Sequence, residues 1–166
     1  MGTARKSIAL TSALLSLGLI VSACSSSTTS TSTATSAATG AIPQVNAANF
    51  TSDFALMKTL TGLASQGKGM VGVLLPDTTT STRYVQYDAP YLKQAFQAAG
   101  LDPSKFKIDN ANGSASTMQT QAEADINAGA SVLLVDPLDP GSGAAIESKA
   151  KAAGVKVIDY DRLVTG

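Results

Sequence analysis

The sequence predicts an α/β fold with a doubly wound parallel sheet. Short apolar segments alternate along the chain with segments of helical character, in the order β-α-β-α-β-α-β. This alternation favours parallel strands that are joined by right-handed helical crossovers. Residues 131–135 are apolar almost without a break, which is typical of a strand covered by helices on both faces. A chain of 166 residues is expected to hold one such domain.

The element boundaries follow from the apolar runs and from the glycines and prolines between them. We expect strands at residues 70–75, 106–109, 131–135 and 155–160. We expect helices at residues 88–99, 114–128 and 141–153.

The helix starts are marked by side chains that can accept hydrogen bonds from a first helical turn. Asp88 is the expected N-cap of the first helix, and Asp139 that of the third. Either Ser114 or Ser116 is expected to cap the second. The first helix has an alternative start near Arg83, which would place a kink at Pro90.

The composition excludes several classes of function. Twelve basic residues balance twelve acidic ones, so the basic surface of a nucleic-acid-binding protein is not expected. There is no histidine, which excludes Ser-His-Asp and Cys-His catalysis and most catalytic zinc sites. We expect no catalytic residues, no cofactor and no metal site, apart from the metal-dependent alternative described below.

The first 23 residues have the pattern of an export signal. Arg5 and Lys6 precede an apolar run at residues 8–23, which is shorter than a comfortable membrane span. The sequence Val-Ser-Ala-Cys that ends at Cys24 resembles the lipobox of bacterial lipoproteins. This resemblance implies cleavage before Cys24, lipidation of Cys24, and attachment to the extracytoplasmic face of the cell membrane. A transmembrane anchor is the alternative.

Residues 24–48 form the second predicted region, a tether rich in serine and threonine. Its segment 25–40 has almost no apolar residues larger than alanine and no charge, so it cannot bury enough surface to fold. Residues 49–166 form the third region, the folded domain. It is expected to begin with an extra helix capped by Thr51 or Ser52, with one apolar face made of Phe54, Met57, Leu60 and Leu63.

Acidic residues follow three of the predicted strands. Asp161 and Arg162 follow the last strand, and ligands of open α/β sheets bind beyond the carboxyl ends of strands. A surface ion pair is the alternative for these two residues. Asp77 and Asp136 follow the first and third strands, where they could hold a divalent metal in a receiver-like or small metal-dependent α/β domain. The alternative for them is turn and cap chemistry.

The folded region resembles the sugar-binding proteins of ABC importers, a periplasmic-binding-protein group that includes ribose- and xylose-binding proteins. The Asp-Arg pair that follows the last strand is the most specific part of the resemblance. The matching segments are Gly72-Val73, Arg83-Tyr84 and residues 121–129, 132–137 and 150–162.

This resemblance implies that the chain binds a monosaccharide, with a pentose such as xylose as the predicted ligand, and delivers it to an ABC permease. It implies that Arg83, Asp161 and Arg162 hydrogen-bond sugar hydroxyls and that Tyr84 stacks on the sugar ring. A sugar-sensing module for another membrane partner is the alternative. The family has further strands in this lobe and a whole second lobe. We therefore expect this chain to be a fragment of the N-terminal lobe that binds sugar weakly by itself.

Overall fold

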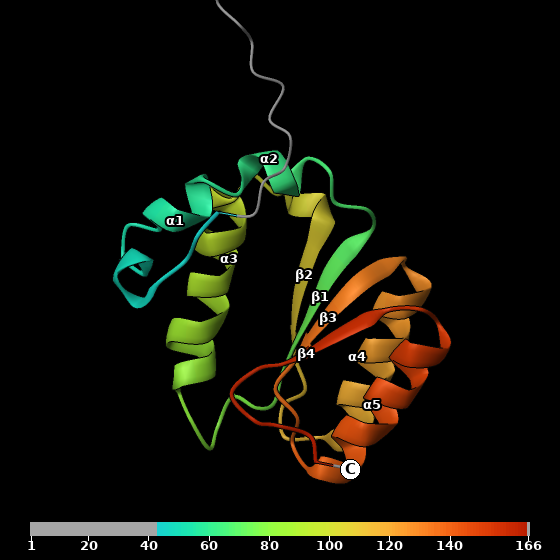
Figure 1. Ribbon diagram of the computed structural model, residues 1–166. Coiled ribbons are helices and arrows are strands. Elements are labelled where there is room, and N and C mark those ends of the chain that lie inside the picture. Colours follow the sequence, from blue (N-terminus) through green and yellow to red (C-terminus); the bar gives the residue numbers. More distant parts are fainter. Residues whose placement is uncertain (1–42, 166) are drawn as a thin grey trace, which may run out of the picture. The chain divides into compact units, whose positions relative to one another are not determined.

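A computed structural model describes residues 43–165, which contain one four-stranded parallel sheet (Figure 1). The order of strands across the sheet is β2-β1-β3-β4, and every neighbouring pair is parallel. The predicted fold class and the four predicted strands are confirmed. The strands are β1 (Met70–Leu75), β2 (Phe106–Asn110), β3 (Ala130–Val135) and β4 (Lys156–Asp159).

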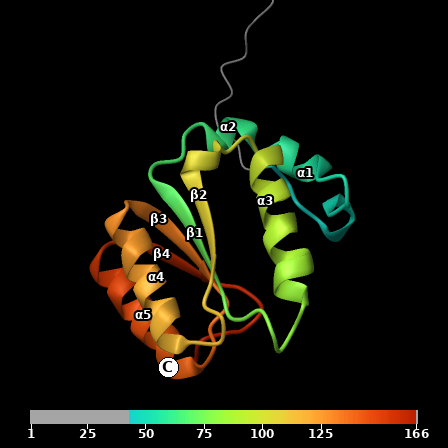
Figure 2. The ribbon, with the colours of Figure 1, turned by 180° about the vertical axis from the view of Figure 1, so that it is seen from behind.

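Helices cover both faces of the sheet, as Figures 1 and 2 show from opposite sides. One face is covered by α3 (Ala89–Ala98), and the other by α4 (Ala115–Asn127) and α5 (Pro140–Ala152). Successive side chains of a strand point to opposite faces. Val73 and Leu75 accordingly belong to the core beneath α3, whereas Leu74 packs with residues of α4 and α5. The continuous apolar sequence of β1 is therefore explained by burial on both faces.

The predicted N-caps of the second and third helices are confirmed. The Ser114 side chain accepts a hydrogen bond from Thr117 N at 3.2 Å at the start of α4. The Asp139 carboxylate accepts one from Ser142 N at 2.8 Å at the start of α5. Each bond satisfies a backbone donor that has no partner inside its own helix.

The predicted capping role of Asp88 is wrong, and the alternative start near Arg83 is correct. A π-turn, η2 (Tyr84–Asp88), leads directly into α3, and Ala89 N donates to Tyr84 O. Pro90 has no N–H group, so the regular bond from position 90 to Gln86 cannot form. The Asp88 backbone is helical and its side chain caps nothing.

The prediction of an extra N-terminal helix is also only partly correct. Two short helices, α1 (Ala55–Lys58) and α2 (Thr61–Ala64), stand where one was expected. The Asp53 side chain, rather than Thr51 or Ser52, accepts a hydrogen bond from Ala55 N at 3.1 Å. The Thr61 hydroxyl donates to Lys58 O at 2.9 Å, a local bond that competes with helical pairing and separates the two helices. Short 3-10 turns lie at Ala47–Asn49 (η1) and Pro103–Lys105 (η3).

A buried carboxylate explains one glycine of β1. Asp125 of α4 is 1% exposed, and Lys107 Nζ donates to its Oδ1 at 3.1 Å. A Cβ atom at position 72 would overlap Asp125 Oδ2 and would lie 2.8 Å from Leu133 Cδ2. Burial raises the pKa of Asp125, and its bond to Lys107 acts in the opposite direction. Gly72 is therefore needed because α4 places a polar side chain directly on the strand.

Residues 1–42 lie outside the described part of the chain, and with them the predicted signal, Cys24 and most of the tether. Within residues 43–165, the helices are all too short or too polar to span a membrane.

Candidate functional site

Asp161 and Arg162 leave the sheet in a tight turn at the carboxyl end of β4. Tyr160 N donates to Val135 O at 2.8 Å, so the alignment with β3 continues one residue past the strand. Asp161 then has a φ of +66°, and Arg162 N donates back to Tyr160 O at 2.7 Å. Aspartate tolerates this left-handed conformation better than most residues do. The turn ends the strand and directs both side chains across the end of the sheet.

Arg162 is fixed by the loop after β3 and by the π-turn before α3. Its Nη1 donates to Pro137 O at 3.0 Å, and its Nη2 donates to the Tyr84 hydroxyl at 2.9 Å. Its Nε lies 3.5 Å from Asp136 Oδ1. The side chain is still 42% exposed. A planar guanidinium that is held on one side and open on the other is suited to binding a polar ligand.

Arg83 bridges two carboxylates that come from different segments. Its Nε donates to Asp88 Oδ2 at 2.9 Å, and its Nη1 donates to Asp161 Oδ1 at 3.1 Å. The bond to Asp88 is the main cause that raises the pKa of Arg83, and the bond to Asp161 adds to it. Asp88 therefore positions Arg83, which is a role that its place at a helix start did not suggest.

Tyr84 lies beneath both arginines and is 2% exposed. Its ring packs with Val73 and Leu75 in the core under α3. The guanidinium carbons of Arg83 and Arg162 lie 5.1 Å and 5.9 Å from the ring centroid, within the range of cation–π attraction. Burial is the main cause that raises the pKa of Tyr84. This position differs from the predicted one, because a buried ring supports the arginines and has no open face for a sugar.

The structure thus brings together the four residues that the sequence singled out, from segments 78 positions apart. Arg83 and Tyr84 come from the segment after β1, and Asp161 and Arg162 from the segment after β4. Parallel strands end at the same edge of a sheet, which is why distant segments meet there. The polar groups of Arg83, Asp161 and Arg162 offer both hydrogen-bond donors and acceptors toward solvent.

Asp77 has the turn role that was the alternative to metal binding. Its Oδ1 accepts hydrogen bonds from Thr79 N at 2.9 Å and Thr80 N at 2.8 Å, and its Oδ2 accepts one from the Thr80 hydroxyl. The Thr80 hydroxyl is the main cause that lowers the pKa of Asp77. Between residues 43 and 165, no group of three or more His, Cys, Asp or Glu residues is arranged to hold a metal ion.

Asp136, the other acidic residue considered as a metal ligand, faces an arginine that the sequence did not pair with it. It follows β3 and is fully buried, and its carboxylate faces Arg162. Burial raises its pKa to about 6. In sequence it resembles Asp77, because both are acidic residues beside a proline within two positions of the end of a buried strand.

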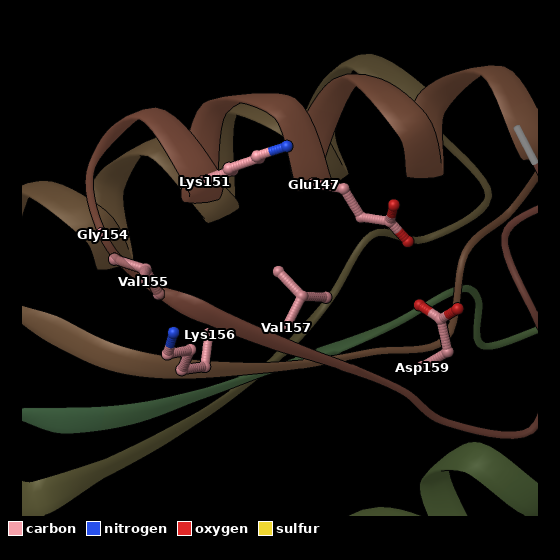
Figure 3. Close-up of a pocket in the computed structure, with 7 residues that line it drawn as sticks. All are labelled: Glu147, Lys151, Gly154, Val155, Lys156, Val157 and Asp159. Carbon is pink, nitrogen blue, oxygen red and sulfur yellow. The ribbon is translucent and has the colours of Figure 1, made fainter.

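A groove of about 410 Å³ runs beside the outer edge of β4, away from these residues (Figure 3). Figure 3 shows the Glu147 side chain extending from α5 with its carboxylate directed toward Asp159, whereas the Lys151 side chain lies along the helix. Burial, and then the charge of Asp159, raise the pKa of Glu147. The groove contains none of the four predicted site residues. It is lined by Glu147, Lys151, Gly154, Val155, Lys156, Val157 and Asp159.

Comparison with known proteins identifies the family. Residues 71–166 match the periplasmic binding protein domain. The chain belongs to the periplasmic binding protein family. No curated protein matches the chain.

Three solved structures of this kind resemble the chain, which spans only about a third or less of their length. A carbohydrate transporter solute-binding protein from Chloroflexus aurantiacus, in complex with D-glucose, is 36% identical with a TM-score of 0.53. The aligned region covers 60% of this chain and 28% of that protein. An ABC transporter solute-binding protein from Clostridium phytofermentans with bound β-D-glucose is 27% identical, with a TM-score of 0.52 and coverages of 58% and 28%. A third, from Mycobacterium smegmatis with bound glycerol, is 26% identical, with a TM-score of 0.51 and coverages of 60% and 33%.

These neighbours of the periplasmic binding protein domain are solute-binding proteins rather than enzymes. The receiver-like alternative required Asp77 as a metal ligand. Since the Asp77 carboxylate is held by its own loop and the family is that of binding proteins, we do not retain this alternative.

Proposed function

We propose that the chain binds a monosaccharide as part of the solute-binding component of an ABC importer, and that it catalyses no reaction. The carrying observation is the cluster of Arg83, Asp161 and Arg162, which meets at the carboxyl edge of the sheet and stays partly open to solvent. The family and the glucose complexes of two relatives support this proposal.

The chemistry of the cluster suits a polyol. A sugar hydroxyl both donates and accepts a hydrogen bond, so a carboxylate and a guanidinium can satisfy one hydroxyl together. Arg83 uses Nε and Nη1 in its bonds to Asp88 and Asp161, and a guanidinium carries five N–H donors in all. Tyr84 has the role of a floor that holds the arginines, rather than of a stacking surface.

Glucose is a second candidate ligand beside the predicted pentose, xylose. The two relatives with sugars in their structures carry glucose, which differs from xylose by a hydroxymethyl group. We propose a monosaccharide of either class and let the measurement decide between them.

The test is a titration of the ¹⁵N-labelled chain with D-glucose, D-xylose and glycerol, followed by NMR. We expect millimolar binding of at least one sugar, because hydrogen bonds to a ligand open to water gain little over solvation. Shifts should centre on the amides of residues 83–84 and 161–162. Lys105→Gln, at the opposite end of the sheet, is the matched control and should bind equally well. Absence of shifts with every sugar, or shifts away from these residues, would contradict the proposal.

We also propose that the protein is attached to the extracytoplasmic face of the membrane through lipidated Cys24 and there meets a permease. The Val-Ser-Ala-Cys sequence and the membership in the periplasmic binding protein family support this. Two or more acyl chains anchor a protein stably. Metabolic labelling with an alkynyl fatty acid should mark the wild type but not Cys24→Ser, and label on the variant would disprove the site.

A further inference from the structure

The carboxylate of Asp136 is buried and poorly hydrogen-bonded. The residue is 0% exposed, and its backbone N donates to Leu74 O at 3.0 Å, which fixes it at the end of the sheet. Neither Oδ1 nor Oδ2 makes a hydrogen bond of regular geometry within the described part of the chain, although the Tyr84 hydroxyl lies near enough to lower the pKa of Asp136. Burying a carboxylate in this way is unfavourable for folding, so a role other than stability is expected for it.

Charged and titratable groups face this carboxylate from two segments. Arg162 and Asp161 approach it from the segment after β4, and Arg83 and Tyr84 from the segment after β1. The nearest charged atom is Arg162 Nε, at 3.5 Å from Asp136 Oδ1. This separation is too long for a strong hydrogen bond but short enough for electrostatic attraction between the buried carboxylate and the partly exposed guanidinium.

Arg162 is therefore surrounded on three sides. Pro137 O and the Tyr84 hydroxyl accept hydrogen bonds from its two terminal nitrogens, and Asp136 faces its Nε. The first two acceptors are neutral. Asp136 is the only one of the three that carries charge, so only its contribution changes with proton uptake.

We propose that Asp136 is a positioning residue that holds Arg162 in the orientation that receives a sugar hydroxyl, and that protonation of Asp136 loosens Arg162 and weakens ligand binding. The inference rests on the proposed function for the consequence to the ligand. The coupling between Asp136 and Arg162 is a property of the chain itself and is measurable without sugar.

The direction of the pH effect follows from the environment of Asp136. Burial raises its pKa to about 6, the charge of Arg162 opposes this rise, and the charge of Asp161 adds to it. At pH 7.5 the carboxylate is ionised and attracts Arg162. At pH 5 about nine-tenths of the molecules carry a proton there, so the attraction is lost. Ligand affinity should fall as the pH falls through 6.

The coupling is tested first, in the absence of ligand. In the ¹⁵N-arginine-labelled chain, the Nε chemical shift of Arg162, assigned from its absence in Arg162→Lys, is followed between pH 8 and pH 4.5. We expect a titration with a midpoint near 6 in the wild type and none near 6 in Asp136→Asn. Asp161→Asn should move the midpoint to lower pH, because it removes a negative charge that faces Asp136. An Arg162 signal that does not titrate, or that titrates equally in Asp136→Asn, overturns the inference.

Two further measurements keep the outcome interpretable. The carboxyl ¹³C shift of Asp136 in the wild type reports its titration directly, so the inference can fail even where Asp136→Asn does not fold. The glucose or xylose titration is then repeated at pH 7.5 and pH 5. In the wild type we expect binding at pH 5 to be at least threefold weaker than at pH 7.5. In Asp136→Asn we expect the same affinity at both pH values. Titration of Arg162 without any sugar binding would refute the proposed function and leave the coupling intact.

Discussion

Arg83 Nη1 donates a hydrogen bond to Asp161 Oδ1 at 3.1 Å, across 78 positions of sequence. The bond joins the segment after β1 to the segment after β4, although β3 lies between these two strands in the sheet. Both side chains are partly exposed, at 41% and 31%. A contact of this kind adds little to stability. Under the proposed function, its importance lies in fixing two groups of the proposed sugar site relative to each other.

Replacing Arg83 by lysine should separate these two effects. Lysine keeps the charge but cannot bond Asp88 and Asp161 together in a planar fork. We expect sugar binding to weaken at least fivefold, while the free energy of unfolding changes by less than about 1 kcal/mol, as for exposed ion pairs. Sugar titration and urea denaturation measure the two quantities. Equal binding by Arg83→Lys would show that the fork geometry has no role.

Tyr84→Phe should test the support beneath Arg162. The ring keeps its packing, but the acceptor of the Arg162 Nη2 bond is lost. We expect a loss of about 1.5 to 3 kcal/mol in the free energy of unfolding, the usual range for a hydrogen bond to a charged group. Tyr91→Phe, at an exposed position on α3, is the control and should change it by less than about 0.5 kcal/mol. Similar results for both variants would argue against the Arg162–Tyr84 bond.

Asp136→Asn should make the chain more stable at neutral pH. The pKa of Asp136 is raised from 3.8 to about 6, so the folded state binds its proton more tightly than the unfolded state does. The wild type therefore loses stability as the pH rises from about 4 to about 6, by at most about 3 kcal/mol. The advantage of Asp136→Asn in urea denaturation should be absent at pH 3.5 and full at pH 7.5. An advantage that is independent of pH would contradict the titration of Asp136.

Gly72→Ala should destabilise the sheet through α4. The new methyl group would meet Asp125 and Leu133, and overpacking of this kind costs about 1 to 3 kcal/mol. Asp125→Ala makes room for part of the methyl group. The loss in Gly72→Ala/Asp125→Ala should therefore be smaller than the sum of the two single losses, as measured by urea denaturation. Additive losses would show that the glycine and the carboxylate do not interact.

Local chemistry explains which parts of the fold could be predicted. The strands are marked by apolar runs, and Ser114 and Asp139 act as caps through bonds to residues three positions away. Asp88 was misassigned because the same carboxylate can cap a helix or bind Arg83, and only the π-turn decides between the two.

The structure brings together the four residues that the sequence singled out, but their contacts could not be predicted. Asp77 and Asp136 look alike in sequence. Asp77 is satisfied by Thr79 and Thr80 within its own loop, whereas Asp136 meets Arg162 only through the order of the strands. For the same reason, the burial of Tyr84 beneath two arginines could not be read from its position beside Arg83.

The π-turn before α3 determines the direction in which Arg83 and Tyr84 face. Such a turn accommodates one residue more than a regular helical turn does, and each residue of a regular helix rotates the chain by about 100°. Deleting Gln86 would leave a helix of ordinary pitch and almost unchanged composition. It would nevertheless turn Arg83 and Tyr84 away from the end of the sheet. The position of Arg83 and Tyr84 at the end of the sheet therefore depends on the number of residues in this turn as strictly as on the identity of its side chains.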